Sequence, residues 1–525
     1  MSRSLLLRAC TALVAVAAIT VPVAGCGSSS SAGGNAGVDP ARFLPASTPL
    51  YLEALVRPEG DLRANVRAVA RKLLRTDDPT QKITDLIDKA LRGQGASYRA
   101  DIEPWLGDRV GFALTGIGGG AASGDGVAAL ASRDDGKAQA FVDGRKNTEK
   151  RTYRGIDYRY DSRQDTAAAV VDHAVLVGSE RGFKSAIDAT NGARLADAKA
   201  FREARDSVTT EGIGFAYLDP SRLFDIATGA AGGKAGQQAQ MLKGVLAGSG
   251  LRSIAAALEV AQNALRVDAA VIGVKAAKGS GDGPGAAADV PADAWLSVGI
   301  GDVGAAIEST LSQLGTSGAI GPLDPETLLQ QLKSGLGVDV RRDFLSWMGD
   351  TALFVRGTSK DQLNGALVVH SKDPAASQRA IGVLRDLLPK LGAKVESLPG
   401  ASGAEGLRVP LGMNGAHPPT VDIAAKGDRF VIALGNGALD AALGGGSRLG
   451  DSSAYKTAAG LLGGAKPSVF LNTPQVVDLV GDAVSATERV SFAMARPTLN
   501  AFGPAAAGVT RDGDKLRVKA AVEVH

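Results

Sequence analysis

The sequence has few of the residues that redox or metal chemistry requires. Its 525 residues include two cysteines, Cys10 and Cys26, and four histidines. The histidines do not have the spacing of metal ligands, and two cysteines at the N-terminus cannot cross-link the rest of the chain. We therefore expect no metal site and no cofactor, and a body stabilised by its hydrophobic core. The four histidines are His173, His370, His417 and His525.

An excess of charge of one sign is also absent. There are 58 Lys and Arg residues against 55 Asp and Glu, and aromatic residues make up only 4% of the chain. Nucleic-acid-binding proteins usually carry a clear basic excess. The composition therefore excludes nucleic acid as an expected partner.

No apolar run is long enough for a typical transmembrane helix. The longest, Ala9 to Ala24, has sixteen residues, whereas about 20 are needed to span a bilayer. Arg3 and Arg8 precede it without any acidic residue. This arrangement predicts a secretory signal peptide, and the separated arginines disfavour a twin-arginine signal.

The end of the apolar run, Val23-Ala24-Gly25-Cys26, resembles the lipobox of bacterial lipoproteins. The resemblance implies that the signal, residues 1–25, is removed and that the Cys26 thiol receives a diacylglyceryl group. Residues 26–40, rich in Ser and Gly, would form a flexible tether. The alternative is an ordinary signal, or an uncleaved anchor, with an incidental cysteine. We expect an exported protein held by acyl chains on the outer face of the cell membrane.

Four blocks of sequence recur in the same order, at offsets that drift from 242 to 257 residues. The clearest are DIEPWLGDRVGFAL (101–114) and DFLSWMGDTALFV (343–355). Such spacing predicts a duplicated domain rather than a solenoid. We place the copies at 41–275 and 291–525, with a Gly/Pro/Ala-rich linker at 276–290. The residues that align in these blocks are Trp105, Gly107 and Asp108 with Trp347, Gly349 and Asp350.

Each copy contains short strand patterns separated by Gly/Asp turns and by helices. Tight turns between neighbouring strands favour antiparallel pairing. Asp61 and Asp302 are the expected N-caps of one helix in each copy. We predict an α+β fold of two tandem copies, with antiparallel sheets and helices laid on one face.

The block P-W-L-G-D and the start LPASTPLYLEA resemble an uncharacterised family of bacterial envelope proteins, catalogued as domain of unknown function 3352. The similarity covers residues 42–525, and the second copy departs from it at Ser346 and Met348. The family has no established activity, so the resemblance implies a location and a fold rather than a reaction. The alanine-rich composition favours an actinobacterial cell.

Three patterns could suggest chemistry, and each has a simpler explanation. Ser453-Ala-Tyr-Lys456 fits S-x-x-K, but the companion motifs of β-lactamases are absent. The glycine-rich segment 116–126 lacks the G-K-[ST] of a phosphate loop and is expected to be a hairpin connection. The recurring Trp, Gly and Asp are expected to pack, turn and bond to backbone.

One helix of the first copy differs from its counterpart in charge. Leu62, Val66, Val69 and Leu73 form an apolar stripe over residues 61–75, and the counterpart keeps this stripe but has no basic residue at 302–314. The extra basic row could contact anionic headgroups, or it could be a solvated face. The row consists of Arg63, Arg67, Arg71 and Arg75.

These observations favour a membrane-anchored, non-enzymatic protein that binds a ligand or takes part in envelope assembly. The expected partners are the membrane, through Cys26, and an unidentified lipid-like ligand or envelope protein. Two alternatives stay open: an envelope hydrolase without a recognisable motif, and a purely structural spacer.

Overall fold

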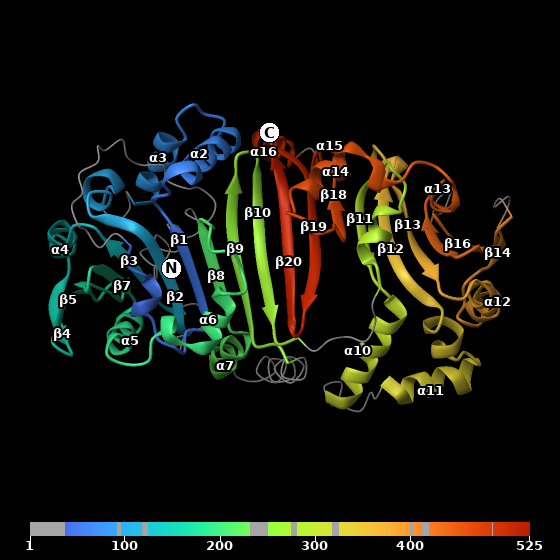
Figure 1. The fold of residues 1–525 in the computed structure, drawn as a ribbon, viewed down its shortest axis with the longest axis horizontal. Coiled ribbons are helices and arrows are strands. Elements are labelled where there is room, and N and C mark those ends of the chain that lie inside the picture. Colours follow the sequence, from blue (N-terminus) through green and yellow to red (C-terminus); the bar gives the residue numbers. More distant parts are fainter. Residues whose placement is uncertain are drawn as a thin grey trace. The chain divides into compact units, whose positions relative to one another are not determined.

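A computed structural model describes residues 37–91, 96–117, 124–230, 250–274, 281–317, 325–398, 403–411, 419–485 and 487–525. The signal segment and Cys26 lie outside these ranges. The chain divides into two compact units, residues 1–274 and 275–513, with the final residues 514–525 divided between them (Figure 1). Each unit is described by itself.

The described residues of unit 1 form ten antiparallel strands. The hydrogen-bonded order is β4-β5-β6-β7-β3-β2-β1-β8-β9-β10, so the first strand of the chain lies inside the sheet, between β2 and β8. The strands are β1 (Leu50–Leu55), β2 (Leu106–Ile117), β3 (Gly124–Ser132), β4 (Glu149–Tyr153), β5 (Ile156–Asp161), β6 (Thr166–Val171), β7 (Ala174–Gly178), β8 (Gly214–Leu218), β9 (Ser253–Ala261) and β10 (Ala264–Ile272).

The helices of unit 1 pack against these strands: α2 lies on β9, α4 on β6, and α5 on β3 and β7. Their bounds are α2 (Gly60–Leu74), α3 (Pro79–Leu91), α4 (Asp135–Asp143), α5 (Glu180–Thr190), α6 (Lys199–Arg205) and α7 (Pro220–Ala230), with single turns η1 (Pro40–Phe43), η3 (Tyr98–Ile102) and η4 (Leu195–Asp197).

The sheet of unit 1 is covered on both faces, not on one as the sequence suggested. In β3, Val127 and Ala129 belong to one apolar cluster, whereas Ala128 and Leu130 belong to another. Successive side chains of a strand point to opposite faces, so each cluster marks a covered face. The physical reason is that β3 is apolar at nearly every position, and it would expose one face if helices packed only on the other.

Unit 2 contains strands in the order β14-β15-β16-β17-β13-β12-β11-β18-β19, and β19 also pairs with β20. All of the pairings in this order are antiparallel. The strands are β11 (Ala294–Ile300), β12 (Met348–Arg356), β13 (Asn364–Ser371), β14 (Glu396–Ser397), β15 (Glu405–Pro410), β16 (Thr420–Lys426), β17 (Arg429–Leu434), β18 (Val469–Leu471), β19 (Phe502–Asp512) and β20 (Lys515–Val524).

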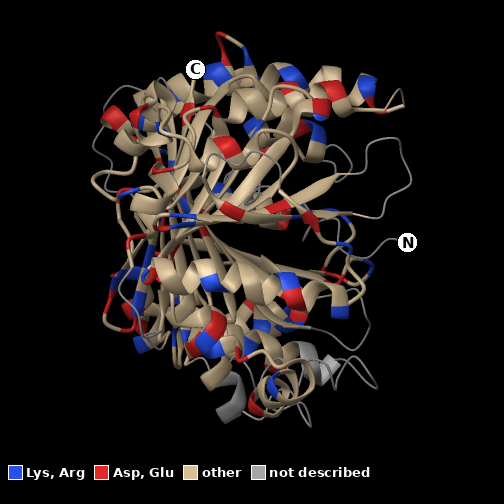
Figure 2. Ribbon diagram, turned by 90° about the vertical axis from the view of Figure 1, so that its right-hand side faces the viewer, with Lys and Arg blue, Asp and Glu red and all other residues tan. Residues whose placement is uncertain are grey.

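Unit 2 also has apolar clusters on both faces of its sheet, because adjacent residues Val368 and Val369 belong to different clusters. In Figure 2, charged residues lie mostly on the outer helices and loops rather than on the strands. The helices are α9 (Gly283–Ala288), α10 (Val303–Ser317), α11 (Pro325–Leu336), α12 (Pro374–Lys390), α13 (Ala438–Leu443), α14 (Ser453–Gly460), α15 (Thr473–Ala483) and α16 (Arg489–Leu499), with turns η5 (Arg341–Leu345), η6 (Lys360–Gln362) and η7 (Leu449–Asp451).

Part of the segment expected to be a linker forms a helix of unit 2. The Asp282 carboxylate accepts a hydrogen bond of 3.0 Å from the Gly285 amide and caps α9. Ala286 and Ala287 are 5% and 0% exposed and pack within unit 2. Small residues that suggest a linker by their composition therefore allow close packing of a short helix against β11.

The two expected N-caps have different outcomes. Asp302 caps α10, because its Oδ1 accepts from the Ala305 amide at 3.2 Å. Asp61 does not cap α2, since that helix begins one residue earlier, at Gly60, and Asp61 lies in its first turn. The fold class, mixed α+β with antiparallel strands, is confirmed. None of the helices in the described ranges has both the length and the apolar content of a membrane span.

Candidate functional site

The predicted basic row lies on the outer side of α2. Arg63, Arg67, Arg71 and Arg75 are all exposed. On the other side of the helix, Val66 and Val69 are each 3% exposed, and Leu62 and Leu73 are half-buried. The apolar stripe therefore packs into unit 1, as the sequence predicts, and the arginines face outward.

The recurring tryptophans are buried packing residues. Trp105 is 2% exposed, its indole Nε1 donates to the Asp101 carbonyl at 2.6 Å, and its ring lies 5.4 Å from that of Phe141. Trp347 is 1% exposed and donates to the Asp343 carbonyl at 2.7 Å. Both indoles are enclosed and hydrogen-bonded within their own unit, which indicates a structural role.

Gly349 and the two aspartates of the blocks have different structural roles. A Cβ on Gly349 would lie 2.6 Å from the His370 carbonyl oxygen, so this glycine is needed for close approach to β13 rather than for a turn. The carboxylate of Asp350 accepts from the backbone amides of Asp282 and Asp302 at 3.0 and 2.9 Å. Asp108 has no such bond among the described residues, and burial raises the pKa of its carboxyl group.

Inspection of the sequence missed two aspartates that precede these tryptophans. The Asp101 carboxylate accepts from the Ser97 amide at 2.7 Å, and the Asp343 carboxylate accepts from the Asp339 amide at 2.8 Å. Each aspartate lies in one turn of π-helix, η3 or η5, four residues before its tryptophan. The pattern D-x-x-x-W recurs in both repeated blocks, at 101–105 and 343–347, and could have identified them.

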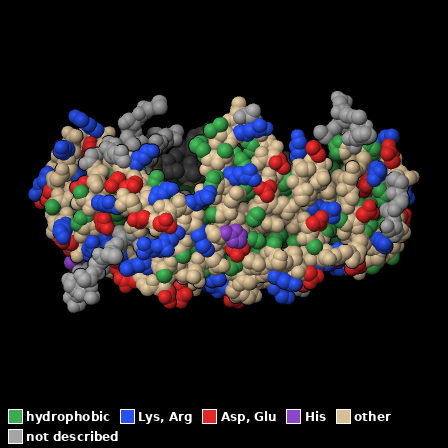
Figure 3. Space-filling view, turned by 90° about the horizontal axis from the view of Figure 1, so that it is seen from above, with side chains coloured by type: hydrophobic (Ala, Val, Ile, Leu, Met, Phe, Trp, Pro, Cys, Tyr) green, Lys and Arg blue, Asp and Glu red, His purple; other side chains and the backbone are tan. Residues whose placement is uncertain are grey.

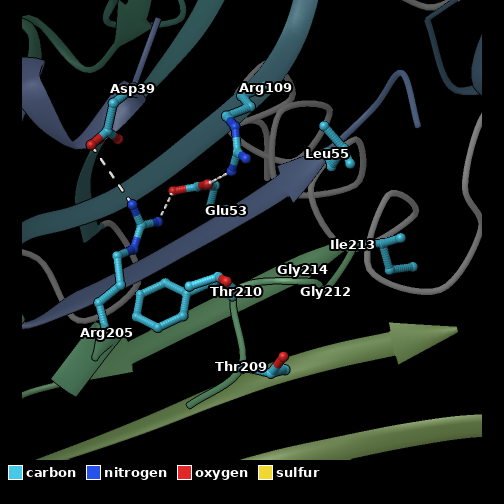
Figure 4. Close-up of a pocket in the computed structure, with 11 residues that line it drawn as sticks. Asp39, Glu53, Leu55, Arg109, Arg205, Thr209, Thr210, Gly212, Ile213 and Gly214 are labelled. Atoms are coloured by element: carbon cyan, nitrogen blue, oxygen red, sulfur yellow. Dashed lines mark hydrogen bonds and ion pairs between the residues drawn. The ribbon is translucent and has the colours of Figure 1, made fainter. Parts of the chain in front are cut away.

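A charged cluster in unit 1 surrounds Glu53, a residue that the sequence did not single out. Glu53 lies on β1 and is 5% exposed. Side chains alternate along a strand, so Tyr51 shares its face and donates its hydroxyl to Glu53 Oε2 at 2.6 Å. Arg109 of β2 and Arg205 at the end of α6 each donate to the same carboxylate. Figure 4 shows Glu53 between the two guanidinium groups.

Asp39 completes the cluster. It precedes η1, where its Oδ1 caps the turn by accepting from the Ala41 amide at 2.9 Å. Its Oδ2 lies 3.7 Å from Arg205 (Figure 4). The four charged side chains come from four separate segments of the chain, and their two positive and two negative charges balance.

Burial and neighbouring charges both shift the pKa values of Tyr51 and Arg205. Burial raises the pKa of Tyr51 well above its ordinary value, and the Glu53 and Asp39 carboxylates raise it further. Burial acts to lower the pKa of Arg205, but Glu53, Tyr51 and Asp39 outweigh this, so the pKa is raised. The arginine therefore stays charged and the tyrosine stays protonated at neutral pH.

The cluster lines a cavity of about 190 Å³. One side is the segment that leads into β8, from Thr209 to Phe215, and the other is the cluster itself (Figure 4). The side chains of Arg109 and Arg205 are 40% and 27% exposed. The cavity therefore offers guanidinium donors to an incoming group, above a buried carboxylate that is already hydrogen-bonded.

The described part of the chain contains no group of His, Cys, Asp and Glu residues that could hold a metal. His173 pairs with Asp135 at 2.6 Å on the surface, and His417 lies outside the described residues. Lys456 donates to the Asp451 carbonyl at 2.9 Å, so it has a backbone partner rather than a role toward Ser453. The ends of β2 and β3 pair Ile117 with Gly124, as a hairpin connection requires.

Comparisons with known proteins give a family and little else. Three solved structures, crystal forms I, III and IV of TP0453, match with TM-scores of 0.26, 0.25 and 0.25 and identities of 12–13%. The matches cover 45–46% of this chain and 81–82% of the TP0453 chains. Similarity this weak supports no argument about function. No curated protein matches the chain. The family model described as "Protein of unknown function (DUF3352)" matches residues 6–515, and the chain therefore belongs to the DUF3352 family.

Proposed function

We propose that this protein is an exported lipoprotein, anchored through Cys26, that binds the anionic group of a ligand in the Glu53 cavity of unit 1. The ligand would belong to a lipid or to another envelope protein. The proposal rests mainly on one observation: two partly exposed arginines line the same cavity and share a buried carboxylate.

The chemistry of the cavity suits an anion. Guanidinium groups recognise carboxylate and phosphate through charge-assisted hydrogen bonds. Arg109 donates through one nitrogen to Glu53, and a guanidinium group carries five N–H donors. The volume, about 190 Å³, is below the roughly 300–1,000 Å³ of pockets that enclose small molecules. The cavity is therefore suited to one small charged group of a larger ligand.

The Glu53 carboxylate of this cavity is poorly suited to a hydrolytic reaction. Glu53 Oε1 accepts from Arg109, and Oε2 accepts from both Tyr51 and Arg205. A carboxylate with both oxygens occupied is poorly placed to act as a general base. The other polar residues that line the cavity are Asp39, which is paired with Arg205, and two threonines; the lining has no histidine, serine or lysine. These features favour binding over catalysis.

We also propose that the units are copies of one ancestral domain. The order of the first nine strands in unit 1, from β4 to β9, matches the order of β14 to β19 in unit 2 when each strand is renumbered by ten. Each unit also has an aspartate in a π-turn followed by a buried tryptophan. The Glu53 cluster is confined to the first copy, since β11 carries no acidic residue.

Native mass spectrometry of the mature protein, extracted from its own envelope in mild detergent, tests the binding function. We expect a bound anionic species that is retained by Arg163→Gln, which alters an exposed arginine away from the cavity, and lost in Arg109→Gln. Equal retention by Arg109→Gln would place the ligand elsewhere. A ligand-free protein that instead copurifies with one envelope protein at fixed stoichiometry would favour the structural-spacer alternative.

A further inference from the structure

The outer face of α2 presents a row of positive charge that contains no acidic residue. From Leu62 to Thr76 the chain has five basic residues and no acidic residue. The opposite face is fixed in unit 1 by the buried Val66 and Val69. The arginines are therefore held outward by the packing of the helix rather than by contacts of their own charges.

The bonds that these arginines make leave their charge uncompensated. Arg63 Nε donates to the Pro58 carbonyl at 3.0 Å, and Arg71 Nε donates to the Asp77 carbonyl at 3.3 Å. Both acceptors are neutral. In the described part of the chain, no carboxylate forms an ion pair with any arginine of the row, whereas Arg109 and Arg205 are paired with carboxylates in the same unit.

The geometry of the helix gives the row a defined extent. Residues four apart along a helix rise by about 6 Å, so the row from Arg63 to Arg75 is about 18 Å long. Arg75 follows the last helical residue in a left-handed conformation, with φ of 50°. Acidic residues flank the row, with Asp61 before it and Asp77 and Asp78 after it. Arg67 and Arg71 therefore occupy the centre of the positive surface.

We propose that this surface, Arg63, Arg67, Arg71 and Arg75 of α2, docks on a bilayer that contains anionic phospholipids. Charge complementarity selects this partner, because phosphate oxygens are strong acceptors for guanidinium groups and an anionic bilayer presents many of them in a plane. Figure 3 shows Lys and Arg side chains, with Asp and Glu among them, over the surface of unit 1 in the left half of the view.

The proposal builds on the anchor at Cys26, which would keep the surface close to the membrane. Val38, near the start of the described chain, follows Cys26 by twelve residues. At no more than about 3.6 Å per residue, this segment reaches about 43 Å. A tether of this length would hold unit 1 near the bilayer, and it would make even a weak charge contact effective by raising the local concentration.

Vesicle co-sedimentation of the mature chain with Cys26→Ser, which carries no lipid, tests the surface independently of both the anchor and the cavity. Vesicles of phosphatidylcholine alone are compared with vesicles that also contain phosphatidylglycerol. We expect binding only to the anionic vesicles, falling at least tenfold between low and high salt. Arg67→Glu with Arg71→Glu should reduce binding at least tenfold, and Arg67→Gln with Arg71→Gln should reduce it less.

A matched control separates the surface from net charge. Lys146→Glu with Arg163→Glu reverses two exposed charges of unit 1 away from α2 and changes the net charge equally; we expect its binding to stay within twofold of the unmodified chain. Equal loss in the control, or no preference for anionic vesicles, would overturn the proposal. The proposal would also be overturned if the chain did not bind vesicles but bound an acidic envelope protein through Arg67 and Arg71.

Discussion

Glu53 shows how a single buried charge can join four segments of one unit. Its carboxylate accepts from Tyr51, Arg109 and Arg205, and Arg205 also lies 3.7 Å from Asp39. Removing two charges from water is costly, and the attraction between them compensates only when the hydrogen bonds are complete. Glu53 therefore contributes less through its own attraction than through the penalty that its loss would impose on the arginines.

Replacing Glu53 with Gln should test this dependence. The substitution keeps the volume of the side chain but leaves Arg205, which is 27% exposed, with much less compensation. Loss of one partner of a buried pair costs about 3–5 kcal/mol, and partial exposure of both arginines reduces this to roughly 2–3 kcal/mol. Urea unfolding measures the change. Glu59→Gln, at an exposed position, is the control and should alter stability by less than about 0.5 kcal/mol.

The lowered pKa of Glu180 predicts that the free energy of unfolding falls at acidic pH. Burial acts to raise its pKa, but hydrogen bonds from Tyr158, Lys184 and Arg151 outweigh this and lower the pKa to about 2. Because the ordinary value is 4.5, the unfolded chain binds this proton more readily. The stabilisation is therefore complete above about pH 4.5 and is lost as the pH falls through 2.

Thermal unfolding between pH 5 and pH 2 measures this effect. In Glu180→Gln the loss of stability across that window should be smaller by roughly 1–2 kcal/mol, a value reduced from the full pKa difference for solvent screening. Glu211→Gln, which alters an exposed carboxylate without an ion pair in the described chain, should follow the unmodified protein. The assignment would be wrong if the two variants lost stability in parallel.

At the scale of elements, local sequence patterns predicted individual helices and their buried faces, but they did not predict which distant strands pair. The period of the stripe at Leu62, Val66, Val69 and Leu73 predicted α2 and its buried face, since helix periodicity is a local property. The position of β1 between β2 and β8 was not predictable, because it depends on partners that are far away in sequence.

The same distinction explains what was missed in the site. The arginine row lies on one helix and could be read directly from its spacing. The Glu53 cluster joins residues 39, 53, 109 and 205, which lie just before η1, on β1, on β2 and at the end of α6. No local pattern brings these residues together. The capping aspartates Asp101 and Asp343 could have been found, because they recur in both blocks at the same distance from a tryptophan.

Substituting two glycines tests whether the close approach of β12 to β13 requires a residue without a side chain. A Cβ at Gly349 would meet the His370 carbonyl oxygen at 2.6 Å, where β12 and β13 are adjacent, whereas a Cβ at Gly382 within α12 would meet nothing within 4 Å. We expect Gly349→Ala to destabilise the protein by about 1–3 kcal/mol through overpacking. Gly382→Ala should stabilise it by about 0.5–1 kcal/mol through helix propensity. Denaturant unfolding measures the free energy of unfolding of both variants. A change of the same sign in both would contradict this account of Gly349.

At the scale of the whole molecule, the chain has two compact units with separate apolar clusters and a cavity in the first. The expected lipid anchor would keep both the cavity and the α2 surface at the membrane. The proposed ligand of the cavity and the anionic lipids proposed to bind α2 would both occur there.

Replacing Cys26 with Ala tests this arrangement as a whole. Lipidation needs the thiol, so the variant, exported behind an ordinary cleavable signal in place of residues 1–25, should carry no acyl chains and should move from the membrane pellet to the aqueous phase in detergent partitioning. Its denatured mass should lack a diacylglyceryl adduct, and Ser30→Ala, a change within the same tether, should keep both the adduct and the membrane fraction. Residual membrane binding that disappears on adding Arg67→Glu and Arg71→Glu would show that the acyl chains and α2 act together, as expected of one strong and one weak attachment. A Cys26→Ala protein that stays in the membrane at high salt would instead require an uncleaved apolar segment as its anchor.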